Sequence, residues 1–154
     1  MWRAAGVLVI LASGAVQAQG LAPYTIDQGA IAQSLTGVAG DPAKGRAIVV
    51  ERQKGLCLLC HSGPFPEERF QGDLAPSLAG IGARLSEGEL RLRMVDSTKV
   101  NEKTIMPPYY RTEGFERVAA NHRGKTLLGA QEIEDVIAFL MTLKDDIQKM
   151  NPQK

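Results

Sequence analysis

Five consecutive residues, Cys57-Leu58-Leu59-Cys60-His61, decide the fold that we expect for this chain. They form a Cys-x-x-Cys-His motif, in which two thiols can add to the vinyl groups of a haem while the following histidine binds its iron. The chain has only these 2 cysteines. The motif therefore predicts one covalently bound haem c, attached at Cys57 and Cys60, with His61 as an axial iron ligand.

Three other interpretations of the cysteine pair fit the sequence less well. A thioredoxin-like redox pair would need a surrounding βαβ pattern, which the sequence lacks. A zinc site needs four ligands, and only His122 remains to complete one. A structural disulfide would leave the adjacent His61 unexplained.

The second axial ligand has five candidates: Met94, Met106, Met141, Met150 and His122. Met94 and Met141 fall in expected helices, where a methionine more often fills the core. Met150 lies in a polar tail, and a solvated surface residue is the simpler interpretation of His122. Met106 precedes Pro107-Pro108, so its backbone is expected to be extended. We predict Met106 as the distal ligand.

A ligating histidine usually donates its other ring N–H to a carbonyl or carboxylate. We take Pro76, within Ala75–Gly80, as the candidate acceptor for His61, with a simple loop proline as the alternative. Ligation by His61 and Met106 would leave no open position on the iron, which suits single-electron transfer. The sequence has no pattern of a second catalytic centre.

The first 18 residues have the pattern of a secretory signal. Arg3 precedes an uncharged run, and Val16-Gln17-Ala18 has small residues where signal peptidase cleaves. The apolar run is shorter than the roughly 20 residues that a membrane-spanning helix needs. We expect cleavage after about Ala18, export to the periplasm and no membrane insertion afterwards.

Removal of residues 1–18 leaves 17 bases and 17 acids, so the formal net charge of the mature chain is zero. A balanced charge without a long basic run gives no electrostatic basis for binding a phosphate backbone. Nucleic acid is therefore not an expected partner.

Helix signals occur at three places after a weakly patterned N-terminal arm, residues 19–40, which we expect to lie outside the core. Asp41-Pro42 begins a helix that should reach about Gln53 and stop at Gly55. Ser86 and Glu89 have the spacing of a capping box, and their helix should end near Asp96.

The last expected helix has an apolar face with Asp135 outside it. That face comprises Ile133, Val136, Ile137, Leu140 and Leu143. Gly- and Pro-rich loops separate the helices, and no stretch has strand alternation. The expected fold is all-α: a class I cytochrome c-like domain over residues 41–154, with few helices and long loops around one haem and an N-terminal extension.

Segments outside the haem motif also resemble a known family. They are Ser34–Gly37, Gly40–Arg46, Thr104–Gly114 and Ile133–Val136. With the haem motif, they are similar to SoxX, the small monohaem subunits of the SoxAX cytochromes of bacterial thiosulfate oxidation. The resemblance implies that Met106 is the distal ligand and that Cys57, Cys60 and His61 hold the haem.

The resemblance also implies partners and a reaction. In that family the complex is an L-cysteine S-thiosulfotransferase that joins thiosulfate oxidatively to a cysteine of the carrier protein SoxYZ, and the SoxA subunit holds the catalytic haem. The joining releases two electrons and one haem iron stores one, so a SoxA-like partner is implied, with a downstream cytochrome c as acceptor. The arm of residues 19–40 would bind that partner or wrap its own domain. The alternative function is a free-standing periplasmic cytochrome c that shuttles electrons.

Overall fold

The computed structural model describes residues 21–145, so the predicted signal peptide and Met150 lie outside the described residues. Within that range there are four α-helices: α1 (Pro42–Val50), α2 (Ile81–Arg84), α3 (Glu87–Asp96) and α4 (Ala130–Thr142). Three 3-10 turns accompany them: η1 (Cys57–Leu59), η2 (Ser97–Lys99) and η3 (Ala120–His122). Residues 21–145 contain no strand, so the all-α prediction is confirmed.

Local side-chain chemistry starts α1 and α3 as the sequence predicts. The Asp41 carboxylate accepts hydrogen bonds from the backbone N–H groups of Ala43 and Lys44, and Pro42 begins α1. The capping box at the start of α3 is confirmed, because Ser86 and Glu89 bond reciprocally. α1 ends three residues before Gln53, since the backbone at Glu51 is extended and a turn leads to Gly55.

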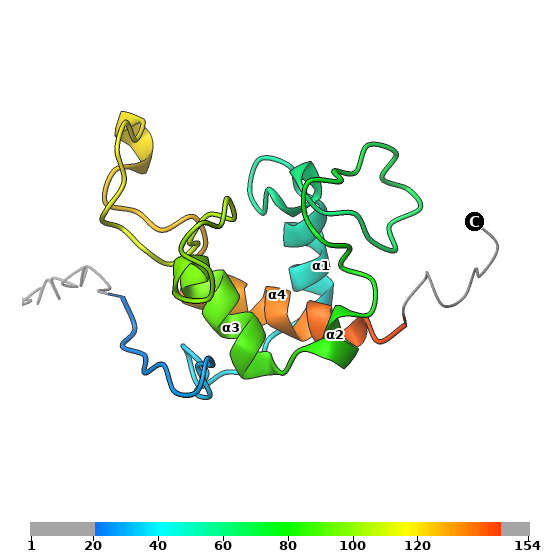
Figure 1. The fold of residues 1–154 in the computed structure, drawn as a ribbon, viewed down its shortest axis with the longest axis horizontal. Helices are drawn as coiled ribbons and strands as arrows, with labels where there is room; N and C mark the ends of the chain where they lie inside the picture. Colours follow the sequence, from blue (N-terminus) through cyan, green and yellow to red (C-terminus); the bar gives the residue numbers. More distant parts are fainter. Residues whose placement is uncertain (1–20, 146–154) are drawn as a thin grey trace, which may run out of the picture.

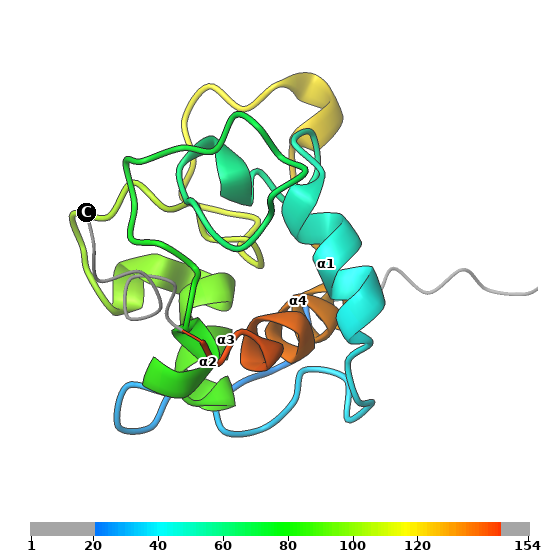
Figure 2. The ribbon, with the colours of Figure 1, turned by 90° about the vertical axis from the view of Figure 1, so that its right-hand side faces the viewer.

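Helices α1 and α4 cross at close range (Figures 1 and 2). The contact depends on Gly45, where an added Cβ would lie 1.9 Å from the carbonyl oxygen of Asp135. Every larger residue at this position would push the two helices apart. α3 and α2 pack along α4 as well (Figure 1), so α4 is the central element of the domain.

The buried face of α4 contains the apolar residues that the sequence predicts, except for Leu143, which is half-buried just after the helix ends. The prediction that Asp135 lies outside this face is wrong, because Asp135 is buried. Its carboxylate accepts a hydrogen bond of 2.8 Å from the backbone N–H of Asp41. A buried carboxylate is tolerated here because it satisfies the backbone just before α1.

Residues 21–40 contain no helix. The expectation that the arm lies outside the core is only partly correct, because two of its residues are buried. Ile31 is fully buried and Leu35 nearly so. The Arg91 guanidinium donates to the carbonyl oxygen of Ile31 at 2.8 Å, and the Glu134 carboxylate accepts from the backbone N–H of Leu35 at 2.9 Å. This part of the arm therefore wraps its own domain.

Arg91 and Glu134 form a buried ion pair with two further bonds, Nε to Oε1 at 2.8 Å and Nη2 to Oε2 at 2.9 Å. Their side chains are only 3% and 5% exposed. Together they join α3, α4 and the arm.

No helix within residues 21–145 has the length and apolar character needed to cross a bilayer.

We expect Glu134→Leu to lower the free energy of unfolding by about 3–5 kcal/mol, because it leaves the buried Arg91 guanidinium with only the exposed Glu87 carboxylate, 3.9 Å from its Nη2, as a counter-ion. Denaturant unfolding followed by circular dichroism measures the change. The double variant Arg91→Met/Glu134→Leu should lose less than Glu134→Leu alone. Lys44→Ala, which breaks an exposed ion pair with Asp41, is the control and should cost about 1 kcal/mol or less. A loss in Glu134→Leu no larger than that of the control would contradict the assignment.

Candidate functional site

A cavity of about 670 Å³ lies between the loops beside the helices. Its lining is mostly apolar and comes from four segments: residues 56–61, residues 74–78, residues 81–85 and residues 93–109. Cys57, Cys60, His61, Pro76 and Met106 all line it. The structure thus brings together every residue that the sequence predicts for the haem site.

The motif residues reach the cavity through one tight turn. Leu56 has a left-handed backbone with φ of 60°, and the turn η1 follows it. The backbone N–H of His61 then donates to the carbonyl oxygen of Cys57 at 2.9 Å. The two residues between the cysteines differ, since Leu58 is 1% exposed in the core and Leu59 is 45% exposed. Burial of Leu58 anchors the turn while its functional side chains face the cavity.

The Pro76 carbonyl oxygen lies 2.7 Å from Nδ1 of His61. Two backbone bonds hold its segment beside the motif: Ala75 N–H to the Cys60 carbonyl at 3.0 Å, and Leu78 N–H to the Ser62 carbonyl at 2.8 Å. An Nδ1–H donated to this carbonyl leaves the lone pair on Nε2, which is the form of imidazole that binds a metal. The geometry supplies what the predicted role of Pro76 requires.

Met106 is the only methionine of residues 21–145 that lines the cavity. Its backbone is held on both sides, because its N–H donates to Thr104 Oγ1 at 3.1 Å and its carbonyl accepts from Ser97 Oγ at 2.6 Å. Met94 is buried in the core, and Met141 packs against the core from α4. Neither is therefore placed to act as a distal ligand in this cavity.

Tyr109 also lines the cavity, although no sequence pattern pointed to it. Its hydroxyl donates to the carbonyl oxygen of Gly55 at 2.6 Å, and its backbone N–H donates to the Met94 carbonyl at 2.9 Å. Burial raises the pKa of Tyr109, so the phenol stays protonated and able to donate. Tyr109 thus ties the Met106 loop to the turn that precedes Cys57. Its position directly after Pro107-Pro108 was the sequence feature that could have indicated a role beside the cavity.

Burial raises the pKa of Cys57 to about 11, and the thiol donates to the Gly55 carbonyl oxygen at 3.3 Å. A redox-active cysteine pair needs a lowered pKa, because the thiolate is the reactive form. The raised pKa of Cys57 therefore does not favour the thioredoxin-like interpretation. Residues 21–145 also contain no group of three or more His, Cys, Asp or Glu side chains placed to hold a metal ion.

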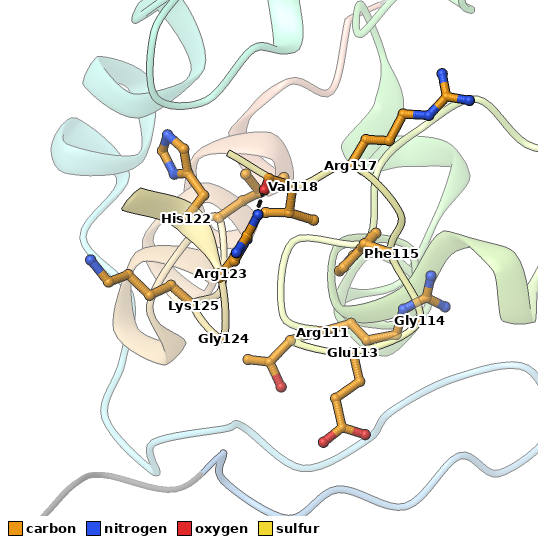
Figure 3. Close-up of a pocket in the computed structure, with 12 residues that line it drawn as sticks. Arg111, Glu113, Gly114, Phe115, Arg117, Val118, His122, Arg123, Gly124 and Lys125 are labelled. Atoms are coloured by element: carbon orange, nitrogen blue, oxygen red, sulfur yellow. Dashed lines mark hydrogen bonds between the residues drawn. The ribbon is translucent and has the colours of Figure 1, made fainter. Parts of the chain in front are cut away.

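A second hollow, of about 500 Å³, lies within the loop from Arg111 to Leu127 (Figure 3). Arg117, His122 and Lys125 point in different directions in this view. Arg123 donates to the Val118 carbonyl and Arg111 pairs with Asp96, so the cations do not converge on one point. His122 is exposed here, away from the cavity that Met106 lines. The first cavity is therefore the candidate functional site.

The all-α fold, with its Cys-x-x-Cys-His turn beside a large apolar cavity, defines a cytochrome c-like protein. A chain of the crystal structure of SoxXA from P. pantotrophus is 38% identical to this chain, with a TM-score of 0.73, over 79% of this chain and 95% of that chain. This chain belongs to the SoxX family, as the sequence predicts. No protein-family model matches it, and no curated protein does either.

We expect Tyr109→Phe to lower the free energy of unfolding by about 1–3 kcal/mol, because it leaves the buried Gly55 carbonyl with only the weak Cys57 thiol donor, 3.3 Å away. Thermal or denaturant unfolding measures the loss. Tyr110→Phe is a matched control, since that hydroxyl accepts, among residues 21–145, only from the partly buried backbone N–H of Ala22. Equal losses in the two variants would mean that the bond to Gly55 is not the one that matters.

Proposed function

We propose that this chain is the electron-transfer haem subunit of a SoxAX-type L-cysteine S-thiosulfotransferase. The supporting observation is the 38% identity to a SoxXA chain over 95% of that chain, together with the motif residues and Met106 on one apolar cavity. The subunit accepts electrons when thiosulfate is oxidatively conjugated to a cysteine of SoxYZ. The chain alone is not the catalyst.

The residues that line the cavity fit one haem c. Cys57 and Cys60 provide the thiols for two thioether links, and His61 and Met106 provide one nitrogen and one thioether sulfur for the iron. The Pro76 carbonyl orients the His61 ring. A bound haem supplies one-electron storage. The apolar walls favour the reduced form of the haem iron, because that form has less charge than the oxidised form. This preference raises the reduction potential of the haem.

The electron count requires a partner. Conjugation of thiosulfate to a thiol releases two electrons, and one haem iron holds one. The proposed partner is a SoxA-like cytochrome subunit, which carries out the conjugation, and the proposed acceptor is a downstream cytochrome c. SoxYZ reaches this chain only through that complex. The proposed location is the periplasm, after cleavage of the signal at about Ala18, in line with the pattern of residues 1–18.

We expect Met106→Ala to abolish the sulfur-to-iron charge-transfer absorption of the oxidised protein while the covalent haem remains. The reason is that Met106 supplies the only methionine sulfur on the cavity among residues 21–145. Absorption spectra measure the band, and intact mass measures the attached haem. Met141→Leu is the control and should keep the band. Persistence of the band in Met106→Ala would refute the distal assignment.

We expect the tagged chain, coexpressed with a SoxA-like subunit and a haem maturation system, to copurify with that subunit in equal amounts. Size-exclusion chromatography measures the association. A chain that carries haem but elutes as a monomer in the presence of SoxA would favour the free-standing electron shuttle instead.

A further inference from the structure

The charged side chains on the cavity are all of one sign. Arg93 and Lys103 line it, and no carboxylate of residues 21–145 does. Within residues 21–145, neither cation has an acidic side chain at ion-pair distance. The cavity of about 670 Å³ therefore has two cations and an otherwise neutral, mostly apolar lining.

Arg93 is half-buried in the last turn of α3. Its Nη1 donates to the Glu89 carbonyl oxygen at 3.1 Å, and the described residues offer its Nη2 and Nε no further acceptor. A guanidinium has five N–H donors in a planar fork, a geometry that suits a carboxylate. A partly desolvated cation without a carboxylate at ion-pair distance is costly, so this position is suited to an anion in the cavity.

Lys103 belongs to the same wall as Arg93. This wall is formed by one segment of the chain, which passes from α3 through η2 to the loop that leads to Met106. Ser97 and Asn101 of the same segment also line the cavity. Lys103 is exposed, so its ammonium lies at the solvent side of the cavity. A haem carries two carboxylates on one edge of an otherwise apolar ring. The number and the sign of the two cations match that edge, and both cations come from one segment of the cavity lining.

We infer that Arg93 and Lys103 bind the two haem carboxylates, so that the carboxylate edge of the porphyrin faces α3 and the loop of residues 100–103. The inference rests on the proposed haem site. Arg93 and Lys103 are positioning residues in this arrangement, and they also act on the reduction equilibrium. A cation paired with each carboxylate removes negative charge near the iron, which favours the reduced form.

The burial of Arg93 and Lys103 predicts which of the two charges has the larger effect on the reduction equilibrium. Arg93 is half-buried, so water and salt screen its charge less than they screen exposed Lys103. Loss of the Arg93 charge should therefore shift the reduction equilibrium more than loss of the Lys103 charge. Lys99, in η2, is also exposed but does not line the cavity, which makes it a matched control for charge alone.

The test uses the full-length holoprotein and four variants: Arg93→Gln, Arg93→Lys, Lys103→Gln and Lys99→Gln. Intact mass gives haem attachment, redox titration gives the reduction equilibrium, and the propionate bending bands in resonance Raman spectra give the hydrogen bonding of the haem carboxylates. We expect Arg93→Gln to shift the equilibrium at least threefold toward the oxidised form and to move a propionate band. Lys103→Gln should also move a propionate band but should shift the reduction equilibrium less than Arg93→Gln does. Arg93→Lys, which keeps the positive charge, should have a reduction equilibrium close to that of the unsubstituted protein.

Arg93→Gln and Lys103→Gln with the potential and bands of Lys99→Gln, in protein that carries haem, would overturn the inference and leave the proposed function standing. An unsubstituted protein without attached haem would instead overturn the proposed function. If Arg93→Gln yields no holoprotein, the decision passes to Lys103→Gln, whose bands must differ from those of Lys99→Gln.

Discussion

Two parallel pieces of backbone hold the candidate site together, and the rest of the site depends on them. Residues 75–78 run beside residues 60–62 through the bonds from Ala75 to Cys60 and from Leu78 to Ser62. This pairing brings the Pro76 carbonyl to 2.7 Å from His61 Nδ1. A backbone acceptor cannot rotate away as a side chain can, so it fixes the orientation of the ring. The proposed chemistry needs that fixed ring, because the potential iron-binding nitrogen must face the cavity.

The opposite side of the cavity depends on the loop that contains Met106. Hydrogen bonds from Ser97 and to Thr104 fix the Met106 backbone, and Tyr109 joins the end of the loop to Gly55. The Gly55 carbonyl precedes the motif by two residues, so one hydroxyl connects the two sides. This connection explains how long loops with little secondary structure can keep a large cavity in a defined shape.

The helices below the cavity depend on close packing and on a buried ion pair. Gly45 lets α1 approach α4, and Arg91 with Glu134 joins α3, α4 and the arm. The ion pair bonds to backbone groups at Ile31 and Leu35, which would otherwise be buried without partners. The arm therefore contributes to the stability of its own domain, and its position is set by polar groups rather than by apolar periodicity.

The sequence by itself determined the all-α class, the starts of α1 and α3, the candidate haem-attachment turn and the membership of the SoxX family. These features are local, because a capping residue, a proline or a Cys-x-x-Cys-His turn acts within a few positions of the chain. The prolines after Met106 also favoured it over Met94. Only the tertiary structure decided that Asp135 and Ile31 are buried, and that Tyr109 and Arg93 belong to the site. Those outcomes depend on contacts between segments far apart in the sequence, which periodicity and spacing do not encode.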